Sequence, residues 1–176
     1  MKKELSGIVL QCVQGDITTQ SDVDCVVNAA NAELMPGGGV AGAIHRAAGS
    51  KLQTECRALA PIKPGEAVIT KAYNLPNRYV IHCLGPVYGI DKPSEQLLAK
   101  CYENALKLAE ENHISSIAFP AISTGAFGFP IKPAAEVAFS TITSMLPNLK
   151  SLKTIRFVLF SNRDYQIHQQ VLEEMS

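Results

Sequence analysis

A strand, a glycine-rich loop and a helix follow one another in the stretch CVVNAANAELMPGGGVAGAIHRAAG, residues 25–49. The apolar residues at its start are typical of a buried strand, and three consecutive glycines, Gly37 to Gly39, interrupt regular structure. The residues that follow return to a helical composition. Strand–loop–helix units build α/β domains, in which helices cover the faces of a mostly parallel sheet.

The same alternation continues on both sides of this stretch. Strands are predicted where short runs rich in Val, Ile or aromatic residues are bounded by turn-forming residues: 8–14, 24–28, 67–73, 79–84, 116–120 and 154–160. Helices are predicted over 41–59, 94–112, 133–145 and 164–175. Since no linker, repeat or low-complexity stretch divides the sequence, we expect one domain over residues 1–176. Its expected architecture is a three-layer α/β/α fold with a mixed, largely parallel central sheet.

Composition places the 176-residue chain among globular proteins, because 47% of its residues are hydrophobic and only 18% are charged. Lys plus Arg and Asp plus Glu both number 16, so bulk attraction to nucleic acid or to a membrane is not expected. The five cysteines have no CxxC spacing, and three lie in strand-like runs, which favours buried, reduced thiols. No apolar segment is long enough for a membrane span. We therefore expect a cytoplasmic protein.

Two glycine-rich loops are candidates for phosphate binding. The first ends in Gly37–Gly39, and the second is PAISTGAFGFP, residues 120–130, again between a predicted strand and a predicted helix. Glycines let a ligand approach the backbone, and the free N–H groups at a helix N-terminus attract anions. A flexible hinge is the alternative for the first loop taken alone. Two loops at strand-to-helix junctions favour a pyrophosphate held from both sides.

Polar side chains near two strand ends suit the rest of a nucleotide. Asp16 follows the first long strand, where its carboxylate can accept from an exocyclic amine or simply form an Asx turn or helix cap. Asn28 and Asn31 bracket two alanines, and their amides can donate to and accept from ribose hydroxyls. Ordinary turn-forming asparagines remain an alternative for these two residues.

Five segments together resemble the ordered signature of macrodomains, the family that binds ADP-ribose and processes Appr-1''-p: GDIT (15–18), NAAN (28–31), GGGV (37–40), IHCLGP (81–86) and ISTGAFG (122–128). The resemblance extends over nearly the whole chain. It implies a mixed sheet flanked by helices, with ADP-ribose in a cleft across the strand ends. It implies no further cofactor.

The resemblance also implies a role for each site residue. Asp16 would bond the adenine amine, the Ile17 N–H an adenine nitrogen or a phosphate, and Phe160 would form a wall beside the adenine. Asn31 would hold the distal ribose against Phe127, and we predict these two as the catalytic residues. The diphosphate would be wrapped by residues of both loops: Gly38, Gly39, Val40, Ser123, Thr124, Gly125, Ala126 and Phe127.

One position departs from the strongly hydrolytic, MacroD-like members of that family. They place Asp directly after the Gly-Gly-Gly-Val segment, where this chain has Ala41. In this respect the chain resembles archaeal and viral macrodomains, some of which hydrolyse without that Asp. The paired glutamates of poly-ADP-ribose glycohydrolases are also absent. We therefore expect slow hydrolysis of mono-ADP-ribosyl esters or O-acetyl-ADP-ribose on ADP-ribose or an ADP-ribosylated protein, with a non-catalytic reader as the alternative.

Other chemistries find less support. Gly37-x-Gly39-x-x-Gly42 matches a dinucleotide-binding fingerprint, but about eight residues separate it from the strand, where that fold needs a tight turn. No His, Cys, Asp or Glu set has metal-ligand spacing, so no metal is expected. Of the four histidines, His45 is predicted on a helix in a surface or packing role and His82 in the core. His113 and His168 are predicted as surface residues near helix ends.

Overall fold

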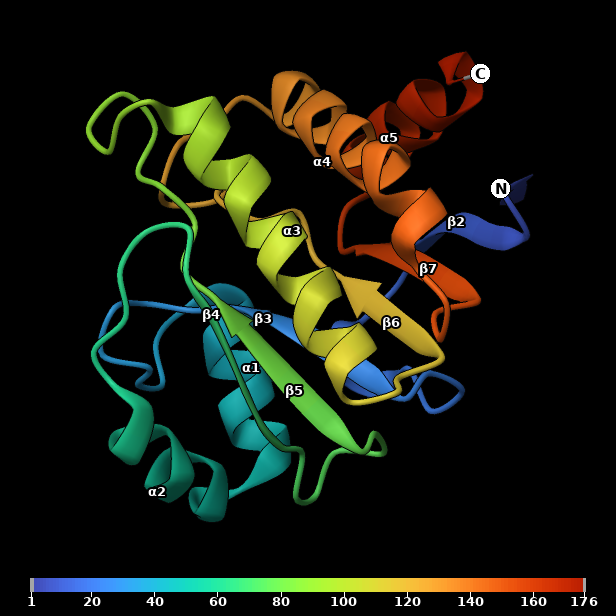
Figure 1. The fold of residues 1–176 in the computed structure, drawn as a ribbon. Helices are drawn as coiled ribbons and strands as arrows, with labels where there is room; N and C mark the ends of the chain where they lie inside the picture. The colour runs from blue at the N-terminus through green and yellow to red at the C-terminus, as the bar shows by residue number, and fades with distance from the viewer. Residues whose placement is uncertain (1, 176) are drawn as a thin grey trace.

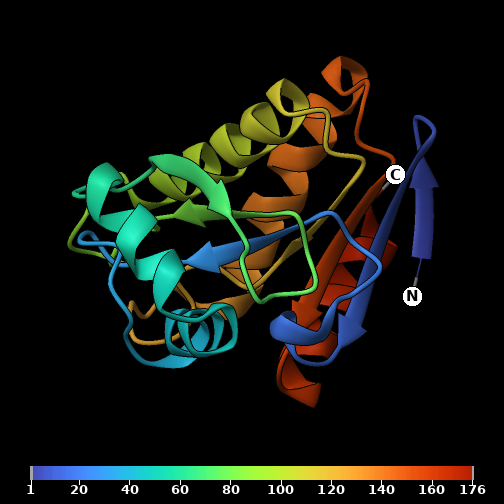
Figure 2. The same ribbon diagram turned by 90° about the horizontal axis from the view of Figure 1, so that it is seen from below.

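The structure, a computed structural model, describes residues 2–175, which form a seven-stranded sheet between two layers of helices (Figures 1 and 2). The strands are β1 (Lys2–Leu5), β2 (Ile8–Gln14), β3 (Cys25–Ala29), β4 (Ala67–Lys71), β5 (Tyr79–Cys83), β6 (Ser116–Phe119) and β7 (Thr154–Leu159). The α-helices are α1 (Gly39–Ala48), α2 (Ser50–Leu59), α3 (Ser94–Glu111), α4 (Ile131–Met145) and α5 (Asn162–Glu174). Two short 3-10 helices are η1 (Ile17–Thr19) and η2 (Leu146–Asn148).

The strand order is β1-β2-β7-β6-β3-β5-β4. The five inner strands are parallel to their inner neighbours, whereas β1 and β4 at the two edges run antiparallel to β2 and β5. The predicted α/β/α architecture with a mixed, largely parallel sheet is therefore confirmed. Parallel strands bring their carboxyl ends to one edge, and this edge collects the loops after β2, β3, β5, β6 and β7.

Successive side chains of the inner strands point to opposite faces of the sheet, where they contribute to two separate cores. In β3, Cys25 and Val27 face the larger core, which lies under α3, α4 and α5, while Val26 faces the smaller core under α1 and α2. The larger core contains an aromatic group in which the Phe157 ring lies 4.8 Å from Phe139 and 5.5 Å from Phe119. Burial on both faces explains why the inner strands are continuous apolar runs.

Most predicted elements are found within two residues of their predicted bounds, with two exceptions. Strand β1 was not predicted, because its four residues are mostly polar and pair only with β2 at the edge of the sheet. The helix predicted over 41–59 is two helices, α1 and α2, separated at Gly49. Gly49 has φ +89°, a left-handed conformation that turns the chain between them and suits glycine best.

One of the histidine predictions is wrong. His168 is buried, with 1% of its surface exposed, and its ring packs beside Phe157 and Phe139. Its position in α5 directs it into the larger core, and its Nδ1 lies 2.9 Å from the Asp164 carbonyl. His113 is exposed after α3, as predicted. The five cysteines are buried and free, and no helix within residues 2–175 is long and apolar enough to cross a membrane.

Candidate functional site

Backbone hydrogen bonds join the loops that meet at the carboxyl edge of the sheet. The Gly15 N–H donates to the Leu159 carbonyl at 3.0 Å, which joins the end of β2 to the end of β7. The Ala30 N–H donates to Cys83 at 2.8 Å, joining β3 to β5, and Tyr88 donates to Phe127 at 2.8 Å. The segments singled out in the sequence therefore share one edge of the molecule.

Asp16 and Ile17 form the turn after β2. The Asp16 carboxylate caps η1, because its Oδ1 accepts from the Thr18 N–H at 2.8 Å and from the Thr18 hydroxyl at 2.6 Å. These bonds lower the pKa of Asp16, so the residue is charged at neutral pH. Ile17 is the first residue of η1, and its N–H therefore cannot find a partner inside that helix. The capping role of Asp16 and a ligand contact through its other oxygen are compatible.

The first glycine-rich loop is shaped by Asn31. Its amide Nδ2 donates to the Met35 carbonyl at 2.8 Å and its Oδ1 accepts from the Met35 N–H at 2.9 Å. A hydrogen bond from Asn31 to a ribose would thus replace or share one of these bonds. Gly38 is the N-cap of α1, Gly39 begins the helix with φ +55°, and Val40 packs against the smaller core.

The second glycine-rich loop turns sharply after β6. Ser123 adopts φ +68° and is 7% exposed, and its carbonyl accepts from Phe129 N–H at 2.9 Å. The Thr124 hydroxyl is already used, because it donates to the Ala121 carbonyl at 2.9 Å. Gly125 accepts from Gly128 N–H, which closes the loop around exposed Ala126. Phe127 is half-buried and, like Val40, packs against the smaller core.

Both glycine-rich loops present open backbone. A Cβ atom built on a loop glycine would meet no atom of residues 2–175 within 4 Å at Gly38, Gly39, Gly125 or Gly128. The loops follow β3 and β6, which are neighbouring parallel strands. The space over the two loops can therefore admit a ligand against the backbone, at the N-terminus of α1, where N–H groups favour an anion.

A buried polar group lies beneath the first loop. His82 in β5, which is fully buried, approaches the Asn28 amide nitrogen through Nδ1 at 3.0 Å and the Thr70 hydroxyl through Nε2 at 2.9 Å. Since that hydroxyl donates to the Lys71 carbonyl, Nε2 carries the ring proton and Nδ1 accepts from Asn28. Burial lowers the pKa of His82 to about 3, so the ring is neutral. His82 is a core histidine, as predicted.

Three buried side chains at this edge keep polar atoms that no residue within 2–175 satisfies: Asn28 Oδ1, Ser123 Oγ and both ring nitrogens of His45. Asn28 ends up 1% exposed in β3, and His45, on the inner side of α1, is 6% exposed. Unsatisfied buried groups are rare in proteins and concentrate where a ligand or water supplies the missing bond. Asn28 near the end of β3, His45 in the helix that follows the first loop and Ser123 in the second loop therefore belong to the segments that form the candidate site.

Two further residues bear on the chemistry. Phe160 follows β7 at the carboxyl edge, and its side chain is 88% exposed, so its predicted contact with adenine remains a prediction. Ala41 is 5% exposed in the first turn of α1 and offers no acid or base. Glu33, the carboxylate nearest in sequence, is exposed ahead of the glycines.

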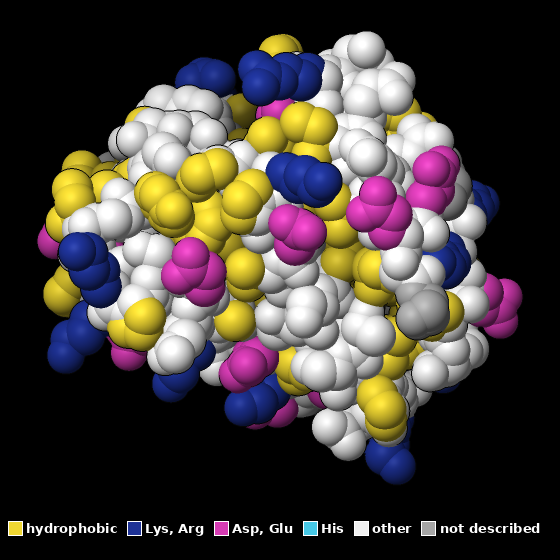
Figure 3. All heavy atoms as spheres, turned by 90° about the horizontal axis from the view of Figure 1, so that it is seen from above, with side chains coloured by type: hydrophobic (Ala, Val, Ile, Leu, Met, Phe, Trp, Pro, Cys, Tyr) yellow, Lys and Arg dark blue, Asp and Glu magenta, His cyan; other side chains and the backbone are white. Residues whose placement is uncertain are grey.

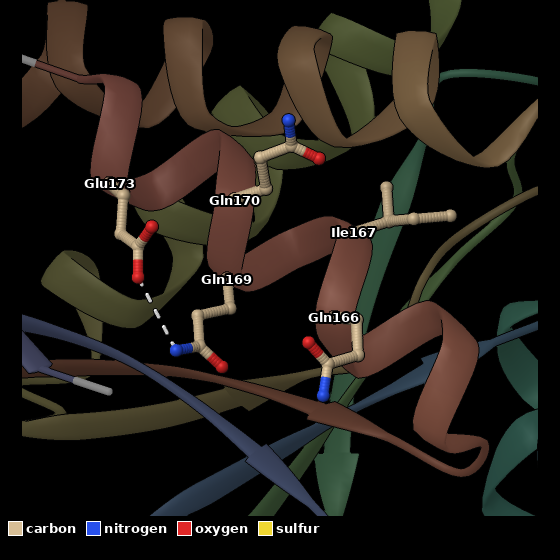
Figure 4. A pocket seen from close by; sticks show the side chains of 5 residues that line it. All are labelled: Gln166, Ile167, Gln169, Gln170 and Glu173. Carbon is tan, nitrogen blue, oxygen red and sulfur yellow. Dashed lines mark hydrogen bonds between the residues drawn. The ribbon is translucent and has the colours of Figure 1, made fainter.

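Two other parts of the surface can be compared with this edge. The hollow in Figure 4 is lined by side chains of one helix, α5, which include Gln166, Gln169 and Gln170. Figure 3 shows a face on which described basic and acidic side chains are interspersed around hydrophobic ones, without a continuous basic stripe. Among residues 2–175, no three His, Cys, Asp or Glu side chains are grouped as a metal site would require.

Sequence reasoning missed the residues that support the Asp16 turn. Gln20 donates from Nε2 to the Asp16 carbonyl at 2.8 Å, and Arg156 in turn donates to Gln20. Arg156 and Gln20 are 136 positions apart. Only the parallel pairing of β2 with β7 brings them together, and no local pattern in the sequence signals it.

Comparison with known proteins identifies related sequences. A profile of the Macro domain family matches residues 27–138. A Macro domain-containing protein of Chlorobaculum tepidum is 48% identical over 167 residues, which cover 94% of this chain and 96% of that protein. The O-acetyl-ADP-ribose deacetylase of Klebsiella pneumoniae is 47% identical over 92% of this chain and 95% of its own. The ADP-ribose glycohydrolase MACROD2 of Mus musculus is 47% identical over 99% of this chain, which spans only 37% of that protein.

Solved structures agree in fold. The Oceanobacillus iheyensis macrodomain with ADP superposes with a TM-score of 0.94 at 42% identity, covering 98% of this chain and 94% of the other. The Trypanosoma brucei macrodomain in complex with ADP-ribose gives a TM-score of 0.85 at 36% identity, covering 93% of this chain and 68% of the other.

Proposed function

The chain belongs to the Macro domain family, and from this premise we propose that it binds ADP-ribose at the carboxyl edge of its sheet and hydrolyses ADP-ribosyl esters. The substrates in this proposal are mono-ADP-ribosyl esters of acidic side chains or O-acetyl-ADP-ribose. The names of two relatives, an ADP-ribose glycohydrolase and an O-acetyl-ADP-ribose deacetylase, support this reaction class.

The observation that carries the proposal is the pair of open glycine-rich loops on neighbouring strands. The loop after β3 and the loop after β6 both present glycines with free space above them. The second loop also contains a buried serine, Ser123, whose hydroxyl lies beside Gly85 and has no partner within residues 2–175. A diphosphate in this space would receive backbone N–H groups from Gly38–Val40 and from Ser123–Phe127.

In this proposal the remaining residues contact the two ends of the ligand, the adenine and the distal ribose. Asp16 and the Ile17 N–H contact the adenine, beside Phe160. Asn31 and Phe127 hold the distal ribose. Asn28 lies three residues before Asn31, near the distal ribose in this proposal. Its buried amide is held by the ring of His82, which fixes the chain at the start of the first loop.

The chemistry proposed for the site rests on positioning. A water held against the distal ribose adds its oxygen to the ester, and the ester C–O bond breaks. The oxygen that leaves takes up the proton of the water, so the products are ADP-ribose and the free carboxylic acid or acetate. Because Ala41 offers no base, the rate gain comes from fixing the ribose and the water, aided by the substrate's own diphosphate. No metal and no further cofactor enters this scheme.

A second candidate function is a reader that binds ADP-ribose without turnover. Ala41 favours it, because the first glycine-rich loop then holds no acidic side chain at the position that the strongly hydrolytic relatives use. The binding site is the same in both cases, and only turnover separates them.

A calorimetric titration followed by a hydrolysis assay on the same sample tests both candidates. We expect ADP-ribose to bind with a micromolar Kd, about −8 kcal/mol, and AMP to bind more weakly because it reaches only one loop. Equal affinity for AMP and ADP-ribose would contradict the two-loop site. Binding without release of ADP-ribose from an ester substrate would assign the reader function.

The proposal also covers the extent of the domain, its partners and the compartment in which it acts. We infer that residues 1–176 act as one macrodomain whose partners are ADP-ribosylated proteins. Appr-1''-p is a further proposed substrate, since its phosphate would lie at the distal ribose. Five buried, free thiols suit the reducing cytoplasm, which we propose as the compartment of action.

A further inference from the structure

Four polar residues form a cluster beneath the turn after β2: Gln11, Gln20, Asp22 and Arg156, called here the Arg156 cluster. Arg156 makes four hydrogen bonds in it. Its Nε donates to Gln11 at 2.7 Å, one terminal nitrogen donates to Gln20 at 2.9 Å and to Asp22 at 2.7 Å, and the other donates to Asp22 at 2.7 Å. The guanidinium is thereby held in one orientation.

The sheet fixes where this cluster lies. Gln11 and Arg156 are register partners in the parallel pair β2–β7. In β7, Arg156 alternates to the same face as Val158, which belongs to the smaller core together with Ile17 of η1. The Arg156 side chain is only 12% exposed, and its hydrogen bond to Asp22 lowers the pKa of that carboxyl to about 2. The cluster thus stays charged and paired at neutral pH.

The Gln20 side chain links the fixed guanidinium of Arg156 to the backbone of the Asp16 turn. Arg156 can only donate and a backbone carbonyl can only accept, so the Gln20 amide has one possible orientation. Its Oε1 accepts from Arg156, and its Nε2 donates to the Asp16 carbonyl at 2.8 Å. Asn77 also holds this segment, because its Nδ2 donates to the carbonyls of Gln20 and Val23 at 2.8 and 2.9 Å.

The Asp16 carbonyl and the Ile17 N–H belong to the same peptide unit. A trans peptide is planar, so its C=O and N–H point in opposite directions. The Asp16 carbonyl accepts from Gln20 at 2.8 Å and also from the Thr19 N–H at 3.2 Å and the Thr19 hydroxyl at 3.0 Å. Gln20 makes the shortest of these three bonds, and together they direct the Ile17 N–H away from the Arg156 cluster. A rotated peptide would present a carbonyl acceptor where the N–H donor now lies, and would invert which base edge the turn can bind.

We propose that the Arg156 cluster, acting through Gln20, sets the base specificity of the nucleotide site by fixing the donor direction of the Ile17 N–H. The inference rests on the proposed function, since it assumes that adenine lies against Asp16 and Ile17. Gln20 and Arg156 are positioning residues in this account, because neither contacts the ligand. An adenine edge offers an amine to Asp16 and a ring nitrogen acceptor to the Ile17 N–H, whereas hypoxanthine offers the opposite pattern.

The test compares Kd values for ADP-ribose and for its inosine analogue by calorimetry. In the wild type we expect a clear preference for ADP-ribose. In Gln20→Ala, and in Asp22→Asn as a second variant, we expect this preference to fall about three- to tenfold, as loss of one hydrogen bond implies. The saturated rate of ester hydrolysis, where there is turnover, should stay unchanged because the distal ribose is untouched.

A matched control comes from Glu110, a carboxylate that fixes a loop away from the site by accepting the N–H groups of Lys150, Ser151 and Leu152. Glu110→Gln should lower the melting temperature without changing the base preference. An unchanged preference in folded Gln20→Ala and Asp22→Asn would overturn the inference while leaving the proposed function intact, as would a wild type that binds both ligands equally. A wild type that binds neither ligand would overturn the proposed function and the inference with it.

Discussion

Asp16 combines a structural bond and a proposed ligand contact in one side chain. Its Oδ1 caps η1 through Thr18, and its charge is assigned to the adenine amine. Asp16→Ala removes both, so we expect ADP-ribose affinity to fall by about 1.5–3 kcal/mol and stability by about 1 kcal/mol. Asp16→Ser retains a capping oxygen but loses the charge, and should lose affinity alone. Titration and thermal unfolding of both variants check this, and an unchanged Kd in Asp16→Ser would remove Asp16 from the site.

Gly39 tests whether the first loop is a cradle or a hinge. Its φ of +55° strains any other residue, whereas a Cβ there would meet open space within the described chain. Gly39→Glu should abolish ADP-ribose binding, because its side chain would fill the diphosphate space and repel the phosphates. Gly39→Ala carries the same backbone strain, about 1 kcal/mol, with little bulk and serves as the matched control. Retained affinity in folded Gly39→Glu would indicate a hinge.

Single residues differ in how far the sequence could place them. The segments around Asp16, Asn31 and Ser123 could be located, because glycines and small polar residues mark the ends of predicted strands. Their bonding could not be predicted, since the Asn31 amide is occupied by Met35 of its own loop. The support of Arg156 for Asp16 was equally hidden, because strand pairing alone makes it.

At the scale of elements, burial decided what could be predicted. The inner strands are apolar on both faces, so their runs of Val and Ile stand out against turn residues. The sequence of β1, KKEL, lacks that contrast because the strand lies at an edge and is largely exposed. The division of α1 from α2 required the backbone conformation of one glycine, Gly49, which an apolar period does not reveal.

His168, which is buried where α5 packs on the larger core, predicts that the folded protein loses stability at acid pH. Burial lowers the pKa of His168, and likewise that of His82, relative to the unfolded chain at about 6.5. The unfolded chain then binds more protons below pH 6.5, so stability is full above this pH and falls as the pH decreases. His168→Leu should reduce the slope of unfolding free energy against pH between 6.5 and 5 by up to about 1.4 kcal/mol per pH unit.

Urea unfolding at a series of pH values measures this slope. His113→Asn is a suitable control, since His113 is exposed after α3 and Asn tolerates its φ of +54°. Carboxylates with lowered pKa, such as Asp22 at about 2, lose their contribution only at lower pH and do not disturb this window. Equal slopes for the wild type and His168→Leu would contradict the assignment of the acid sensitivity to α5.

At the scale of the whole molecule, the site exists because five parallel strands end at one edge. Alternating strands and helices were enough to predict that the loops converge there. The strand order, β1-β2-β7-β6-β3-β5-β4, was not predictable, because it depends on contacts far apart in the sequence. That order makes β3 and β6 neighbours and thereby faces the two glycine-rich loops toward one space. It also places the proposed ribose residues, Asn31 and Phe127, on loops from different halves of the chain.

Catalysis is therefore predicted to depend on that long-range pairing rather than on an acid or base. We expect slow, single-turnover release of ADP-ribose from a glutamate-linked substrate by the wild type. Asn31→Ala and Phe127→Ala should each slow it about a hundredfold, because the distal ribose and the water lose their fixed positions. Phe160→Ala, an aromatic truncation at the proposed adenine end, should weaken binding while leaving the saturated rate unchanged.

The bonds between Asn31 and Met35 require one more measurement, since Asn31→Ala also loosens the first glycine-rich loop. ADP lacks the distal ribose, so its affinity reports the state of that loop alone. If Asn31→Ala binds ADP normally but releases ADP-ribose slowly, Asn31 acts on the ribose. If ADP binding falls in parallel with the rate, Asn31 acts through the loop. A wild type that releases nothing above the buffer control is a reader, and an Asn31→Ala variant as fast as the wild type places the chemistry on other residues.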